Sequence, residues 1–116
     1  MEKHYNLEFL IDYYGDDRES MRQILQLYLQ ETPKDLNTIK SALYGNDATA
    51  AKAATHKIKT NVAMLGMKDP AGFMNEMHLH SGQSDVSDLV KNLFNDFEAE
   101  ISRGLRSIES DFFMKE

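Results

Sequence analysis

His56 stands between two lysines at helical spacing, with Lys52 four residues before it and Lys59 three residues after it. A neutral imidazole that titrates near physiological pH can act as a nucleophile as well as a base. A phosphoryl group on its ring nitrogen would need nearby positive charge, which a lysine can supply. The residue types therefore permit phosphoryl transfer at His56, and a solvent-exposed histidine without any role is the competing interpretation.

The stretch Ala50–Met67 has to position this histidine. It is rich in alanine and contains neither glycine nor proline before Gly66, so propensity predicts a helix. Asn46 or Asp47 is the expected N-cap, and Gly66 is the expected residue just after the helix. One arc is expected to face the core and comprises Ala51, Ala54, Thr55, Ile58, Val62 and Leu65. His56 lies away from this arc and is predicted to point at solvent.

Small side chains surround His56 on its exposed face. Ala53 lies three residues before it, and Thr60 and Ala63 lie four and seven residues after it. Because residues at these spacings are neighbours on a helix surface, a partner's active site would have room to close over the imidazole ring. Met64 flanks this face and can either meet a partner's apolar surface or pack into the core.

The residues Thr55–Lys59 (THKIK) and Asn61–Gly66 (NVAMLG) resemble the signature of histidine-containing phosphotransfer (HPt) domains. Members of this family carry a phospho-accepting histidine, an apolar residue two positions later, a lysine three positions later, and a glycine ten positions later. The resemblance implies that His56 is the phosphoryl acceptor and that Lys59 is the cation beside the phosphoryl group. The family usually has glycine after this lysine. Thr60 stands there in this chain and could crowd the ring or donate a hydrogen bond to a phosphoryl oxygen.

Length and composition indicate one helical domain spanning residues 1–116. A chain of 116 residues with 41% hydrophobic and 28% charged residues is typical of a soluble globular protein. The apolar residues are mainly Leu, Ile, Met and Ala, which favours helices over strands. No alternating strand pattern, internal repeat or low-complexity segment is present.

Composition also excludes several classes of function. A net charge of −6 argues against generic nucleic-acid binding, which requires a basic surface. The absence of cysteine excludes disulfides and thiolate metal sites and fits a reducing cytoplasm. No apolar run is long enough to span a bilayer, and the first residues lack the apolar core of a signal peptide, so we expect a cytoplasmic protein without membrane attachment. His78 and His80 would point to nearly opposite sides of a helix, so we expect no metal site.

Two helices are expected before the one that carries the histidine. A short amphipathic helix within Tyr5–Tyr14 should lie across one end of the molecule, and a partly ordered arm is the alternative. Asp16 or Asp17 then caps a long helix that runs to the next turn. Its apolar stripe comprises Met21, Ile24, Leu25, Tyr28, Leu36, Ile39 and Leu43. The stripe keeps its phase across Pro33, which favours one kinked helix over a break at Glu31.

A further helix is expected to open with Asp69 as N-cap and Pro70 as its first residue, and to turn Phe73 and Met77 inward. After the polar linker 81–85, the last helix should start at the end of that linker and run to about residue 112. Its inner face is expected to comprise Val86, Leu89, Val90, Leu93, Phe97, Ile101 and Ile108. Gly104 is in phase with this face and either permits close approach of another element or weakens the helix.

Four amphipathic helices joined by short turns make an antiparallel bundle. We therefore expect an all-α protein, an antiparallel four-helix bundle with an additional short N-terminal helix. HPt domains have the same architecture, so the resemblance covers essentially the whole chain. A bundle implies no function by itself, and the functional expectation rests mainly on the resemblance.

The resemblance implies a phosphorelay carrier in two-component signalling, without catalytic activity of its own. His56 would take a phosphoryl group from an aspartyl-phosphate on the receiver domain of a hybrid sensor histidine kinase. It would pass the group to the aspartate of a response regulator, with transfer in either direction and with Lys59 stabilising it. The carrier would need no cofactor, because the receiver domain supplies Mg²⁺. The docking face of this expected monomer would comprise Ala53, Thr60 and Ala63, with Lys52, Lys57 and Met64 at its margin.

A helical adaptor that binds a signalling partner without being phosphorylated is the alternative. Thr60 supports this alternative, whereas the presence of both His56 and Lys59 argues against it. A phosphotransfer domain that belongs to a longer kinase chain is a third possibility.

Overall fold

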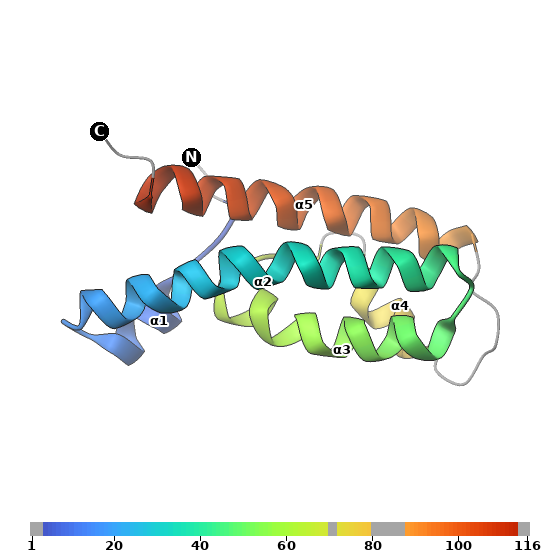
Figure 1. Cartoon of the computed structure of the whole chain (residues 1–116), viewed down its shortest axis with the longest axis horizontal. Coiled ribbons are helices and arrows are strands. Elements are labelled where there is room, and N and C mark those ends of the chain that lie inside the picture. Colours follow the sequence, from blue (N-terminus) through green and yellow to red (C-terminus); the bar gives the residue numbers. More distant parts are fainter. Residues whose placement is uncertain (1–3, 70–71, 80–87, 114–116) are drawn as a thin grey trace.

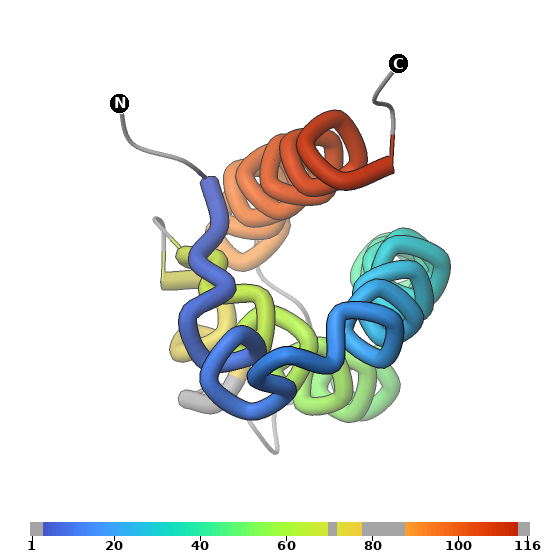
Figure 2. The backbone as a smooth tube through the Cα atoms, turned by 90° about the vertical axis from the view of Figure 1, so that its left-hand side faces the viewer, coloured from blue at the N-terminus to red at the C-terminus, as the bar shows by residue number. Residues whose placement is uncertain are grey.

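The computed structural model describes residues 4–69, 72–79 and 88–113, which form five helices and no strand. The helices are α1 (Glu8–Tyr14), α2 (Arg18–Tyr44), α3 (Ala48–Met64), α4 (Phe73–Leu79) and α5 (Asp88–Phe112). Three long helices, α2, α3 and α5, run along the molecule, α4 lies beside α3, and α1 lies at one end (Figure 1). The end-on view shows the helices arranged around a common core (Figure 2). The all-α bundle with a short N-terminal helix is confirmed.

Helix ends agree with the caps expected from sequence. Asp17 caps α2 by accepting a hydrogen bond from the Ser20 N–H at 3.1 Å. Asp47 caps α3 by accepting one from the Ala50 N–H at 3.0 Å. Each aspartate satisfies one of the backbone donors that a helix leaves unpaired at its start. Gly66 follows the last turn of α3 with a φ of 59°, the left-handed conformation expected of a residue that ends a helix.

Pro33 lies inside α2, which is one helix from Arg18 to Tyr44 rather than two. Proline removes one N–H from the helical ladder, and α2 changes direction in its middle part (Figure 1). The expected apolar stripe holds, because Leu25, Leu36, Ile39 and Leu43 are buried. The unbroken phase of the stripe keeps both halves of α2 packed on the same core.

The inner face of α5 differs in part from the expected one. Val90, Phe97, Ile101, Gly104 and Ile108 are buried as expected, and Leu93 is half-buried. Leu89, however, is 55% exposed, and Phe94, which was not predicted, is fully buried. Neighbouring residues on a helix point about 100° apart, so a stripe that runs through Val90 turns Leu89 outward and brings Phe94 inward.

α4 begins later than the sequence predicted, at Phe73. Asp69 nevertheless supports its start, because its carboxylate accepts hydrogen bonds from the N–H groups of Phe73 (2.9 Å) and Met74 (2.7 Å). The ring of Phe73 packs against Phe94 and Phe97 of α5, with centroids 5.3 and 5.1 Å apart. The described part of α4 has only seven residues and is shorter than the other bundle helices.

Several expected features of this region lie outside the described residues. They are Pro70, His80, the linker 81–85, Val86 and the predicted start of the last helix. The end of that helix at Phe112 is confirmed. Among the helices of the described residues, none combines the length and apolar character needed to cross a membrane.

The N-terminal segment, residues 4–7, crosses α5 and the end of α3 instead of forming the first turn of α1. The short helix expected within Tyr5–Tyr14 is confirmed and spans Glu8–Tyr14. Hydrogen bonds join the segment to distant residues: Asn6 N–H to the Leu65 carbonyl (2.9 Å), His4 Nδ1 with Glu100 Oε2 (3.0 Å), and the Tyr5 hydroxyl to Asp111. These contacts join the segment to α3 and α5 in a path that is not helical.

Two glycines make room for the N-terminal segment. A Cβ atom added to Gly104 would lie 2.6 Å from Met67 Sδ and 2.7 Å from the His4 carbonyl oxygen. A Cβ atom added to Gly66 would lie 2.2 Å from the Asn6 carbonyl oxygen. Gly104 thus permits close approach, which is the first of the two expected roles.

The carboxyl group of Glu100 makes the stability of this region sensitive to acid. Burial alone would raise the pKa of Glu100, but hydrogen bonds from His4 and Arg103 outweigh this effect and lower it. A pKa lowered by folding gives a stabilisation that is present above the unfolded value of about 4.5 and is lost as pH falls through the folded value. We expect the free energy of unfolding, measured with urea between pH 3 and 7, to fall less steeply below pH 4.5 in Glu100→Gln than in the wild type. Glu109→Gln, an exposed substitution on the same helix, should follow the wild type; equal curves for all three proteins would contradict this prediction.

Candidate functional site

His56 lies on the solvent-facing side of α3, as predicted. The whole expected core arc of this helix is buried: Ala51, Ala54, Thr55, Ile58, Val62 and Leu65. Ala53, Thr60 and Ala63 are exposed around the histidine, and Met64 is half-buried against the core. The side chain of His56 is therefore available to an incoming protein, with small residues three positions before it and four and seven positions after it on the helix.

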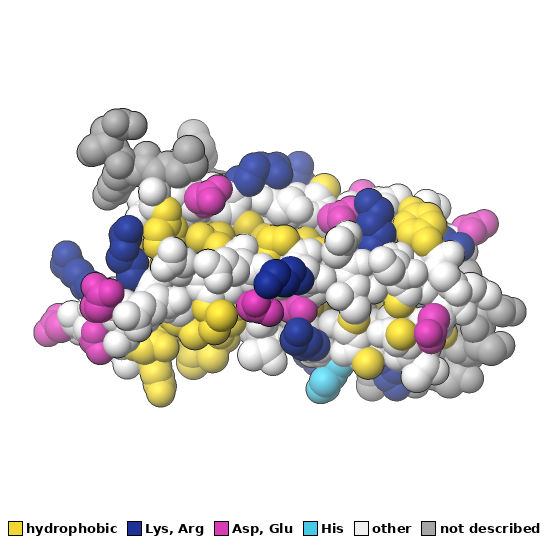
Figure 3. Space-filling view, viewed as in Figure 1, with side chains coloured by type: hydrophobic (Ala, Val, Ile, Leu, Met, Phe, Trp, Pro, Cys, Tyr) yellow, Lys and Arg dark blue, Asp and Glu magenta, His cyan; other side chains and the backbone are white. Residues whose placement is uncertain are grey.

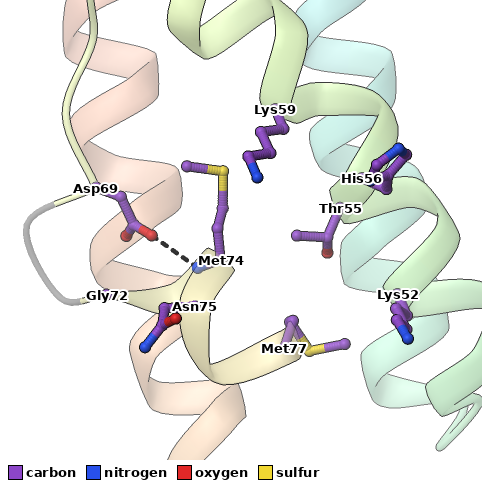
Figure 4. A pocket seen from close by; sticks show the side chains of 9 residues that line it. All are labelled: Lys52, Thr55, His56, Lys59, Asp69, Gly72, Met74, Asn75 and Met77. Atoms are coloured by element: carbon purple, nitrogen blue, oxygen red, sulfur yellow. Dashed lines mark hydrogen bonds between the residues drawn. The ribbon is translucent and has the colours of Figure 1, made fainter. Parts of the chain in front are cut away.

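A cleft of about 460 Å³ opens between α3 and α4, and His56 is one of the residues that line it. The α3 wall is formed by Lys52, Thr55, His56 and Lys59; the opposite wall is formed by Asp69, Gly72, Met74, Asn75 and Met77. Figure 4 shows Lys59 extending from α3 toward the α4 side, with His56 on the rim. Sequence reasoning did not predict this cleft, because its two walls come from different segments whose relative placement helical periodicity does not determine.

Lys52 and Lys59 give the cleft its charge. In the part of the chain that the structure describes, neither ammonium group has an ion-pair or hydrogen-bond partner. Both side chains are exposed and stand on the same helix as His56. Their positive charges are therefore free to meet an anionic group that approaches the imidazole ring.

Lys57 lies on the other side of His56 and is engaged by α2. Its ammonium group lies 2.9 Å from Asp35 Oδ1, and Asp35 is buried. The hydrogen bond to Asp35 and the charge of that carboxylate raise the pKa of Lys57. Asn61 of α3 donates hydrogen bonds to Asp35 Oδ2 (3.3 Å) and to Thr32 Oγ1 (3.2 Å). These four residues form a polar cluster between α2 and α3.

This polar cluster was missed by sequence reasoning. Asp35 directly precedes Leu36 in the α2 stripe, and a charged residue at the edge of a stripe is ordinarily expected to be solvated. Only the pairing of α2 with α3 reveals that Asp35 faces Lys57. Lys57 is thus held by the fold, whereas Lys52 and Lys59 are not.

The difference between the lysines can be measured. We expect Lys57→Ala to lower the urea midpoint of unfolding, because it leaves the buried carboxylate of Asp35 without its cation. The matched variant Lys52→Ala, which removes an exposed lysine of the same helix, should leave the midpoint within error of the wild type. Equal midpoints for the two variants would show that the Asp35–Lys57 pair does not stabilise the fold.

A second surface feature lies on α1. Phe9, Ile11 and Tyr13 are large apolar side chains that are more than half exposed, and the rings of Phe9 and Tyr13 stack with centroids 6.4 Å apart. Hydrophobic side chains are visible at the α1 end of the molecule and in a row between α2 and α5, with charged side chains scattered over the rest of this face (Figure 3). Exposed apolar groups of this kind are typical of protein contact surfaces.

Within the described residues, no three histidine, cysteine, aspartate or glutamate side chains are grouped to hold a metal ion.

Comparisons with known proteins give one positive result. A family model described as "Hpt domain" matches residues 23–107, which include α3 and His56. No curated protein matches the chain. A search of solved structures gave no match either.

Proposed function

The chain belongs to the Hpt domain family, and from this premise we propose that His56 is the histidine that carries the phosphoryl group. Members of the family carry phosphoryl groups on histidine in two-component phosphorelays, and in general they are phosphocarriers without autonomous catalysis. The observation that supports His56 is its exposure on α3, within the matched region and beside Lys59, which has no ion-pair partner among the described residues. His4 lies outside the matched region.

In the proposed reaction a receiver domain of a hybrid sensor histidine kinase presents its aspartyl-phosphate to His56. The lone pair of an unprotonated ring nitrogen forms the N–P bond while the P–O bond to the aspartate breaks and the carboxylate leaves. Lys59 and the Mg²⁺ ion of the receiver domain neutralise the phosphoryl oxygens. The same steps in reverse deliver the group to the aspartate of a response regulator. The carrier itself requires no cofactor.

The proposed docking face surrounds His56. Ala53, Thr60 and Ala63 supply small exposed side chains that let the receiver approach the ring. Lys52 and Met64 lie at the margin, and Lys57 shares that margin while paired with Asp35. We propose a monomeric, cytoplasmic carrier that forms one domain over residues 1–116, since one exposed face suffices for both transfer steps.

An adaptor that binds a receiver domain without phosphorylation is the second candidate, and Thr60 is the observation that favours it. A β-branched residue is larger than the glycine usual at this position and is exposed next to His56. In this candidate function the protein binds the receiver domain through the docking face, but His56 does not accept a phosphoryl group.

The deciding experiment incubates the protein with phosphorylated receiver domains and maps any phosphate by mass spectrometry and acid lability. An acid-labile phosphate on the peptide that contains His56 would support the carrier function. Receiver domains that bind without transferring phosphate would instead support the adaptor, and Thr60→Gly would then test whether threonine blocks the ring.

A further inference from the structure

We infer that the cleft between α3 and α4 receives an apolar side chain of the receiver domain, and that α4 thereby helps to select the partner. This inference rests on the proposed function. It adds α4 to a docking face that the proposed function places on α3 alone. The first argument is position: because His56 lines the cleft, a protein that covers the ring also covers the mouth of the cleft.

The second argument is the chemistry of the cleft walls. Met77 is buried and Met74 is half-buried, so the α4 wall offers methionine side chains, which adapt to apolar groups of different shape. The hydroxyl of Thr55 donates to the Ala51 carbonyl at 2.7 Å and therefore has no hydrogen left to donate to a ligand. The Asp69 carboxylate is likewise engaged by two backbone N–H groups. The interior thus favours an apolar occupant over a polar one.

The third argument is the positive charge on the α3 wall of the cleft. Lys52 and Lys59 have no ion-pair partner among the described residues, and both line the cleft. A receiver domain brings an acidic pocket to the histidine, so its negative charges would meet these lysines while a neighbouring apolar side chain enters the cleft. A central apolar anchor inside a charged rim is the usual organisation of a specific protein interface.

Asn75 allows the inference to be tested without disturbing the core, because it lines the cleft and is exposed on α4. Asn75→Trp should cover the mouth of the cleft. The matched control is Asn95→Trp, the same substitution at an exposed position of α5 that does not line the cleft. Each variant is assayed for transfer from the receiver domain that labels the wild type, and for labelling by phosphoramidate, a small donor that needs no docking face.

We expect Asn75→Trp to raise the receiver concentration for half-maximal transfer by about tenfold, the usual effect of losing one apolar anchor. The rate at saturation and the phosphoramidate labelling should equal those of Asn95→Trp. Met74→Ser, which removes the apolar wall instead of covering it, should act in the same direction.

Equal half-maximal concentrations for the two tryptophan variants would overturn the inference and would move the docking face toward the exposed apolar residues of α1. A loss of phosphoramidate labelling in Asn75→Trp would also overturn it, because the tryptophan would then obstruct the ring rather than the docking. Absence of transfer to the wild type from every receiver domain is a separate result, which would refute the proposed function itself.

Discussion

His56→Gln is expected to abolish acid-labile phosphorylation by a receiver domain while leaving binding to that domain nearly unchanged. Glutamine retains a polar side chain of similar length but has no nucleophilic ring nitrogen. Because His56 is exposed, the substitution should change the free energy of unfolding by no more than about 0.5 kcal/mol. The measurement combines labelling with phosphorylated receiver, binding by titration calorimetry, and urea denaturation of the same preparation.

The control is His78→Gln, which makes the same change at a histidine of α4 and should be labelled like the wild type. If the label persisted in His56→Gln and disappeared in His78→Gln, the phosphoryl group would be carried by His78 of α4 and the assignment to His56 of α3 would be wrong. Loss of both label and binding in His56→Gln would show that the ring also serves as a docking contact. The pair of variants therefore separates chemistry from recognition.

Gly66→Ala is expected to produce a large loss of stability, for two reasons that add. The backbone at Gly66 has a φ of 59°, where a residue with a side chain is less stable than glycine by about 1–2 kcal/mol. Its Cβ atom would also lie 2.2 Å from the backbone oxygen of Asn6, so the N-terminal segment would have to move. Forcing an atom into such a contact typically costs a further 1–3 kcal/mol, on the order of overpacking in a core.

Gly72 provides the matched control, because it shares the positive φ (73°) but has nothing within 4 Å of the added Cβ position. Gly72→Ala should therefore show only the backbone cost, about 1–2 kcal/mol. The difference between the two variants in urea denaturation measures the contact between Gly66 and Asn6. If both substitutions lower the free energy of unfolding equally, the N-terminal segment moves away from the added Cβ atom without loss of stability. The close approach of Asn6 to Gly66 would then not stabilise the fold.

Helical periodicity predicted most of the fold because each long helix buries one continuous stripe. Every residue of the arc on α3 is buried, and the exposure of His56 follows from its position opposite that arc. The caps Asp17 and Asp47 were also predictable, since an N-cap depends on residues only two or three positions away. Helical periodicity and capping preferences are therefore sufficient where a feature depends on residues of the same helix.

The sequence predictions were wrong or incomplete for residues whose burial is determined by contacts between distant segments. Leu89 was assigned to the core because the sequence offers two adjacent apolar residues, Leu89 and Val90, of which only Val90 is buried. The burial of Phe94 accompanies its packing against Phe73 of α4. The burial of Asp35 depends on Lys57, which lies on a different helix. Within the candidate site, the exposed histidine was predictable and the cleft beside it was not, because the cleft requires the relative placement of α3 and α4.

The contacts of the N-terminal segment also imply an order of folding. The polar cluster between α2 and α3 joins residues 26 and 29 positions apart, whereas the bonds of His4 and Tyr5 span 96 and 106 positions. Closing a loop costs about 0.6 kcal/mol more for each doubling of its length, so the α2–α3 hairpin has the entropic advantage and should form first. The bonds of His4 and Tyr5 to α5 can form only after α5 has joined the hairpin. During synthesis, the part of this chain that is made first would therefore be the last to reach its native position.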